Sequence, residues 1–155
     1  MRRLILVLLL LHFVYRLYAQ HYKRSAGLRA GVPYGFTYKQ IIKKHNAFEV
    51  YAATRWTGGI SFGTLWLTHY DPDIYPGVLV FAGGGVESGF WNDNSDYING
   101  PGAGWAFGIT ASVGAEYEFD TLPLSIGLDW IPMLNLLENT VFDAGRIGVS
   151  LRYLF

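Results

Sequence analysis

The residues of this sequence that could carry out nucleophilic or acid–base chemistry are few and widely separated. A serine-type site needs a hydroxyl nucleophile, a histidine base and a carboxylate within hydrogen-bonding reach of one another. The histidines beyond residue 20 are His21, His45 and His69, and His69 lies two residues before Asp71. Residues 93–96 offer two acids and a serine but no histidine. The spacing assembles no complete set, so we predict a protein without catalytic residues.

A second chemical possibility is a calcium loop, because Asn92, Asn94 and Asp96 place side-chain oxygens at alternate positions. Such a loop needs a glycine at its sixth position and a glutamate at its twelfth. Tyr97 and Ala103 stand at those two positions. The chain also has no cysteine, which removes thiolate metal sites and disulfides. We therefore predict no metal ion and no cofactor.

The start of the chain is typical of a secretory signal peptide. Two arginines follow Met1, residues 4–11 are all apolar, and a small residue stands at Ala19. The apolar run is shorter than the roughly 20 residues of a spanning helix, so a membrane anchor is the weaker reading. We predict removal of residues 1–19, with the exact cleavage site left open by the large Leu17. Residues 20–155 would then form one domain.

The charge of that domain bears on its partners. The leader contains three arginines and no acid, so residues 20–155 carry 9 basic and 12 acidic residues, a net charge of −3. A nucleic-acid-binding protein needs a basic face. We therefore expect no nucleic acid among the partners.

The domain reads as a series of β-strands. In residues 109–119 the odd positions are apolar, while the even positions are small or polar and include Glu116 and Glu118. A period of two separates these side chains onto the two faces of a strand, whereas a helix would mix them. Residues 122–130 and 147–155 alternate in the same way. The sequence therefore predicts an all-β fold.

Turn residues between the alternating segments indicate the number of strands. Short turns are expected at 43–46, 57–59, 71–76 and 120–121, and longer loops at 86–104 and 132–143. Residues 26–42 alternate without interruption, so they could form one strand or two strands broken at residues 33–35. Single-chain bacterial barrels have even strand numbers. We therefore predict two strands there, eight in all, in an antiparallel up-and-down barrel with both termini at the same end.

Ten charged residues fall on the face opposite the apolar one. They are Arg29, Lys39, Glu49, Arg55, Glu87, Glu116, Glu118, Asp129, Arg146 and Arg152. Five are basic and five are acidic. An eight-stranded barrel is barely wide enough for its own side chains, and an unpaired buried charge costs several kcal/mol. If this face points inward, we expect a mutually paired network that plugs the lumen.

Alternation alone does not say which face points inward, since a soluble barrel would bury the apolar face instead. The apolar face is almost free of charge, as lipid requires, because a lipid-facing Arg or Lys costs ~2–4 kcal/mol at the bilayer midplane. Aromatic side chains also gather near strand ends, in the pattern of interfacial girdles. We expect Trp56, Trp105 and Trp130 near the outer rim, and Tyr70, Tyr117 and Phe119 near the inner one.

The leader, the alternating strands and the chain's last ten residues resemble the small outer-membrane β-barrel family of Gram-negative bacteria, of the OmpA-like transmembrane-domain type. The last strand carries Arg146, Gly148, Leu151, Tyr153 and Phe155 in the spacing of that family's closing strand. The resemblance implies an outer-membrane location and surrounding lipid. It also implies that these five residues act as an assembly signal for the barrel-assembly machinery. No peptidoglycan-binding domain is expected after Phe155.

The predicted function is that of an integral outer-membrane barrel without catalytic activity. It would be structural or adhesive, or a small subunit of an outer-membrane assembly, with a possible protein partner at loops 86–104 and 132–143. A narrow channel or small-solute transporter is one alternative. An outer-leaflet lipid-modifying enzyme is another, although His45 and His69 are expected at the inner end and His21 in the N-terminal tail.

Overall fold

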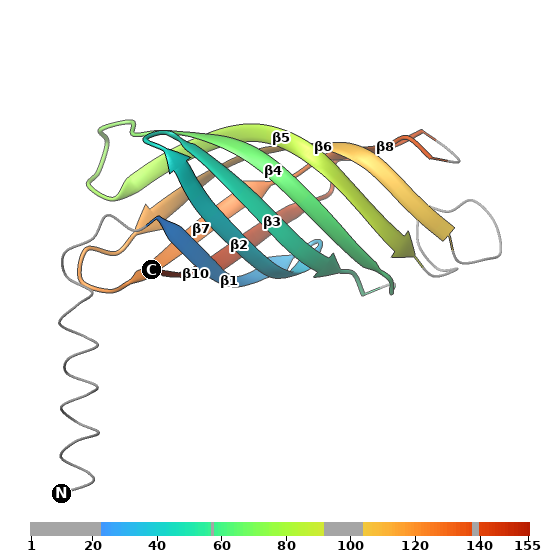
Figure 1. The fold of residues 1–155 in the computed structure, drawn as a ribbon, viewed down its shortest axis with the longest axis horizontal. Coiled ribbons are helices and arrows are strands. Elements are labelled where there is room, and N and C mark those ends of the chain that lie inside the picture. The colour runs from blue at the N-terminus through green and yellow to red at the C-terminus, as the bar shows by residue number, and fades with distance from the viewer. Residues whose placement is uncertain (1–22, 57, 92–103, 138–139) are drawn as a thin grey trace, which may run out of the picture.

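The computed structural model describes residues 23–56, 58–91, 104–137 and 140–155, which form a single β-barrel (Figure 1). The expected signal peptide and the calcium-like residues 92–96 lie outside these residues. No helix in the described ranges is long and apolar enough to cross a membrane.

Ten antiparallel strands account for the described secondary structure. They are β1 (Arg24–Gly31), β2 (Tyr34–Lys43), β3 (Asn46–Thr54), β4 (Ile60–Tyr70), β5 (Val78–Trp91), β6 (Gly104–Glu118), β7 (Leu124–Trp130), β8 (Met133–Asn135), β9 (Val141–Asp143) and β10 (Ile147–Leu154). Each strand from β1 to β6 pairs with the next, β1 also pairs with β10, and β10 pairs with β7. The pairing therefore closes the sheet on itself.

The two short strands do not add positions to the barrel. β7 pairs with residues 113–118 of β6, and β8 pairs with residues 108–110 of the same strand. Because β9 pairs with β8, β8 and β9 extend the hairpin formed by β7 and β10. The barrel has eight strand positions, and the predicted eight-stranded antiparallel fold is confirmed. The predicted division of residues 26–42 is also confirmed, because β1 ends at Gly31 and β2 begins at Tyr34. Gly31 has a φ of 121°, a left-handed conformation that glycine adopts without strain.

The predicted loop at residues 86–104 is wrong in its first part. β5 continues to Trp91, with Val86 opposite Ile109 and Trp91 opposite Gly104. Full pairing with β4 and β6 outweighs the weak strand propensity of Gly89 in this segment. Only residues 92–103 separate the two strands, and they lie outside the described ranges.

The predicted loop at residues 132–143 is also wrong in part, because six of its twelve residues belong to β8 and β9. The strand is interrupted only at Ile131 and Pro132, between Trp130 at the end of β7 and Met133 at the start of β8, and Pro132 lacks an N–H. Its carbonyl still accepts hydrogen bonds from the Ala111 N–H and the Thr110 hydroxyl, at 3.1 and 3.0 Å. Pairing then resumes at Met133, which is buried.

The barrel has two distinct ends. We call the terminus end the one that carries Lys23, Phe155 and the connections β2–β3, β4–β5 and β6–β7, at the left of Figure 1. The loop end carries the connections β1–β2, β3–β4, β5–β6 and β8–β9. Between the ends, large apolar side chains point outward: Leu28 is 68% exposed and Phe62 is 60% exposed. Inward-pointing side chains are polar or charged along most strands.

Candidate functional site

The interior of the barrel contains most of its charged side chains, arranged in groups along the axis. The group nearest the terminus end, which we call the four-charge cluster, consists of Lys39 on β2, Glu49 on β3, Glu116 on β6 and Arg152 on β10. Lys39 Nζ lies 2.5 Å from Glu116 Oε2 and 3.9 Å from Glu49 Oε2. Arg152 lies 2.9 Å from Glu49 Oε1 and 3.5 Å from Glu116 Oε2. Two positive and two negative groups therefore join four strands.

Three uncharged side chains complete the surroundings of this cluster. The Thr37 hydroxyl donates a hydrogen bond to Glu49. His69 Nε2 lies 3.5 Å from Lys39 Nζ, and the Phe81 ring lies 4.9 Å from the same ammonium. The ammonium is thus held by a carboxylate, an imidazole and an aromatic face. His69 was expected at the inner end, and the structure places it at the terminus end, buried and pointing inward.

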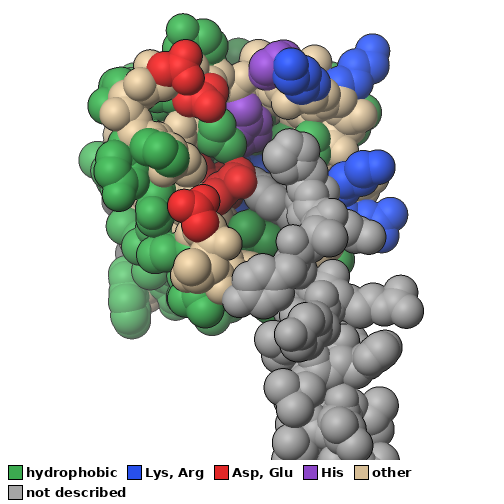
Figure 2. Space-filling model, turned by 90° about the vertical axis from the view of Figure 1, so that its left-hand side faces the viewer, with side chains coloured by type: hydrophobic (Ala, Val, Ile, Leu, Met, Phe, Trp, Pro, Cys, Tyr) green, Lys and Arg blue, Asp and Glu red, His purple; other side chains and the backbone are tan. Residues whose placement is uncertain are grey.

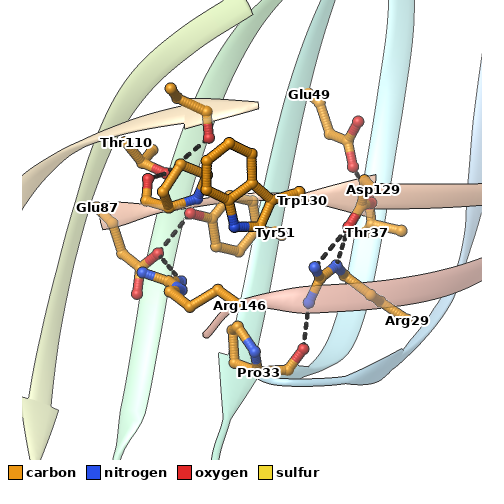
Figure 3. A network of polar contacts seen from close by, with 12 residues as sticks. Arg29, Pro33, Thr37, Glu49, Tyr51, Glu87, Thr110, Asp129, Trp130 and Arg146 are labelled. Atoms are coloured by element: carbon orange, nitrogen blue, oxygen red, sulfur yellow. Dashed lines mark hydrogen bonds and ion pairs between the residues drawn. The ribbon is translucent and has the colours of Figure 1, made fainter. Parts of the chain in front are cut away.

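A second group lies further along the axis, where Arg29 on β1 binds Asp129 on β7 (Figure 3). Arg29 Nη2 and Nε donate to Asp129 Oδ1 at 2.5 and 3.1 Å, and Nη1 donates to the Pro33 carbonyl. The guanidinium lies directly over Gly148 on β10, where a Cβ atom would collide with it. The absence of a side chain at Gly148 therefore makes room for this ion pair.

A third group joins Arg146, Glu87 and Tyr51, and it is also drawn in Figure 3. Arg146 Nη2 lies 2.5 Å from Glu87 Oε2, and the Tyr51 hydroxyl donates to the same oxygen at 2.5 Å. The Tyr51 ring fills the space above Gly63 on the next strand. One carboxylate oxygen thus receives hydrogen bonds from two buried side chains.

At the loop end, Arg55 forms an ion pair with Asp143 on β9. These two side chains are 13% and 19% exposed, whereas both partners are at most 5% exposed in the ion pairs of the three deeper groups. The Arg55 guanidinium also lies 5.6 Å from the centre of the Trp91 ring, which is buried against the interior. Among the ion pairs of these four groups in the interior, Arg55–Asp143 is therefore the most accessible to water.

The structure brings together most of the charges singled out from the sequence. Arg29, Lys39, Glu49, Glu87, Glu116, Asp129, Arg146 and Arg152 are buried in the interior with partners of opposite sign. Arg55 and Glu118 are only half-buried, and Glu118 ends β6 at the terminus end. Asp143 was missed because its segment was taken for a loop. Thr37, Tyr51 and His69 were missed as partners, although their register already pointed inward.

The aromatic residues expected as girdles lie near the two ends. Trp56, Trp105 and Trp130 are exposed toward the loop end, and Trp56 is 87% exposed. Tyr70, Tyr117 and Phe119 lie at the terminus end, where the Tyr117 and Phe119 rings are 4.9 Å apart. Along β10, Leu151, Tyr153 and Phe155 point outward, whereas Gly148 lies in the wall and Arg146, just before the strand, points inward.

The carboxylates and histidines of the described residues are the side chains that a metal site would need. Within the described residues no three His, Cys, Asp or Glu side chains lie close enough together to hold a metal ion. The carboxylates of the interior are instead bound by arginine, lysine, threonine and tyrosine side chains.

Comparison with known proteins supports the architecture. No protein-family model matches the chain, and no curated protein matches it. Among solved structures, the chain is similar to the N-terminal β-barrel domain of Pseudomonas aeruginosa OprF, with a TM-score of 0.63 and 14% identity. The match covers 85% of this chain and 95% of that domain. At this identity the likeness concerns the fold.

Proposed function

We propose that this chain is an integral outer-membrane β-barrel protein of a Gram-negative bacterium that acts without catalysis. The proposal rests on the distribution of side chains, which is the reverse of that in a soluble barrel. Apolar side chains such as Leu28 and Phe62 point outward, and charged side chains point inward. Soluble proteins rarely expose a continuous apolar surface, whereas a membrane barrel needs one. The fold shared with the barrel domain of OprF supports the same location.

The interior is proposed to be closed to solutes. Each of the eight buried charges has a partner of opposite sign, and removing a partner from such a pair leaves a buried charge that costs several kcal/mol. An eight-stranded barrel leaves little space beyond its inward side chains. Opening a path would mean separating several pairs at once.

The role of the closed barrel is proposed to be structural or adhesive, or that of a small subunit in a larger assembly. The loop end supports contact with a partner, since Trp56, Trp105, Leu136 and Leu137 are exposed there. Exposed apolar groups of this kind often mark binding surfaces.

Neither alternative function gains support from the geometry. A narrow channel would be lined by Arg29, Glu49, Arg55, Glu116 and Arg152, but all five are held in ion pairs. A lipid-modifying enzyme would need a serine or histidine with a carboxylate near the outer rim. Of the histidines in the described residues, His45 lies exposed in the β2–β3 turn at the terminus end, and His69 is buried beside Lys39 near the same end.

Cell fractionation combined with gel migration tests the proposal. The protein should sediment with the outer membrane, and unheated samples should migrate differently from boiled ones, as folded barrels do. Recovery from the soluble periplasm would contradict it. Planar-bilayer recordings test the closed interior, because steady large conductance would mean an open path. Unchanged lipid A in mass spectra of cells with and without the gene would agree with the absence of catalysis.

A further inference from the structure

One side of the terminus end carries an unbroken group of positive charges. We call the basic arc the four exposed residues Lys23 and Arg24, at the start of β1, and Lys43 and Lys44, at the end of β2. The two pairs belong to neighbouring strands, since the Ile41 N–H donates to the Lys23 carbonyl at 2.8 Å and Arg24 lies opposite Gln40. Their side chains therefore share one part of the rim.

The negative charges of the same end lie elsewhere on the rim. Residues 23–26 and 40–48 contain no Asp or Glu. The exposed acids Asp71, Asp73 and Asp120 belong to the β4–β5 and β6–β7 connections, and we call them the acidic arc. Figure 2 looks onto this end and shows basic side chains gathered on one side and acidic ones on the other. The rim is therefore electrically polarised.

The strand register places the basic arc at the border of the apolar wall. Arg24 lies in a cross-strand row with Phe155, Gln40, Phe48 and Trp66, and the three aromatic members of that row are exposed. Lys43 lies opposite Asn46, which in turn lies opposite the exposed Thr68. Toward the middle of the barrel, the outward row contains Leu28 and Phe36. Arg24 thus lies within an outward aromatic row and Lys43 lies beyond it, at the level where a bilayer passes from acyl chains to phosphates.

We propose that the basic arc binds the headgroup phosphates of anionic phospholipids in the leaflet at the terminus end. The inference rests on the proposed membrane location and adds a lipid preference confined to one side of the barrel. Arginine can hold a phosphate with two parallel hydrogen bonds, and lysine binds it as a point charge. An acidic soluble partner fits less well, because Arg24 and Lys43 occupy outward register beside exposed aromatic and apolar groups rather than positions around the barrel mouth.

Spin-labelled lipids in vesicles containing the purified protein test the proposal. The measurement compares the association of labelled phosphatidylglycerol with that of labelled phosphatidylcholine. One basic side chain near an anionic membrane surface raises the binding constant about fivefold. The four side chains together should therefore produce a preference of at least about fivefold for phosphatidylglycerol over phosphatidylcholine. Salt at about 1 M should reduce the preference, because it shortens the screening length to about 3 Å.

Two variants locate the preference on the rim. The quadruple variant K23Q/R24Q/K43Q/K44Q should bind the two lipids about equally. The matched control D71N/D73N/D120N should keep the preference for phosphatidylglycerol. The wild-type Asp71 Oδ1 accepts a hydrogen bond from the Asp73 N–H at 2.9 Å, and the side-chain oxygen of an asparagine at position 71 can accept the same bond. All substituted residues are exposed, so each variant should retain heat-modifiable migration.

The outcomes separate the inference from the proposed function. A heat-modifiable barrel without lipid preference, or with equal preference in the wild type and the basic-arc variant, overturns the inference alone. Loss of the preference in the acidic-arc control overturns its assignment to the basic arc. A chain that does not insert into vesicles at all overturns the membrane location together with the inference.

Discussion

The four-charge cluster and the Arg55–Asp143 pair both consist of charged side chains in the barrel interior. They differ in how deeply these side chains are buried and in how many groups of opposite charge each one contacts. In the cluster, Lys39 and Arg152 each lie within 4.0 Å of both Glu49 and Glu116, and the four side chains are at most 5% exposed. Arg55 and Asp143 face each other near the loop end at 13% and 19% exposure. Water can replace a lost partner at the loop end but not in the cluster. Burial should set the main difference in what each group contributes to stability, and the number of charged partners a smaller one.

The largest effect is expected from Glu116→Gln, which removes one of two negative charges from the four-charge cluster. Breaking a buried pair by neutralising one partner costs about 3–5 kcal/mol, because the opposite charge stays buried. Urea titration of the barrel in vesicles, followed by the unheated gel shift, measures this loss. A Glu116→Gln variant as stable as the wild type would refute the paired cluster.

A smaller loss is expected from Asp129→Asn. Arg29 would keep its hydrogen bond to the Pro33 carbonyl and an amide oxygen in place of the carboxylate. Breaking a buried pair costs about 3–5 kcal/mol, and the hydrogen bonds that Arg29 keeps should place this loss at the lower end of that range in the same urea titration. A loss as large as that of Glu116→Gln would mean that the number of partners does not matter.

Tyr51→Phe tests a single neutral donor at similar depth. The change removes the hydroxyl that donates to Glu87 and leaves the Arg146–Glu87 pair in place. We expect a loss of about 1 kcal/mol, as for an ordinary buried hydrogen bond. Exposed Tyr70→Phe, on the outward face, is the matched control and should leave the urea midpoint unchanged.

The smallest effect is expected from Asp143→Asn at the loop end. Partly exposed pairs contribute at most about 1 kcal/mol, and salt screens them. The urea midpoint should shift slightly at low salt and less at high salt. A shift comparable to that of Glu116→Gln would abolish the distinction between the two regions.

Much of this architecture could be predicted because a strand period of two sorts side chains by face. Alternation placed Arg29, Glu116 and Asp129 on one face, and the near absence of charge on the opposite face indicated that theirs points inward. Their partners could not be predicted, since Lys39 reaches Glu116 across 77 residues of chain, and that contact depends on the stagger between strands that are distant in sequence. Asp143 was missed because residues 132–143 were predicted to form a loop. The pairing of β6 with β8 restores the ladder beyond Pro132.

The position of Arg29 has a kinetic consequence. β1 and β10 are the first and last strands, so their pairing closes the barrel, and Gly148 on β10 stands between Arg29 on β1 and Asp129 on β7. The Arg29–Asp129 ion pair can therefore form only after the last strand has taken its place between them. Its formation should coincide with the final step of folding, and once formed it should slow the separation of the first strand from the last.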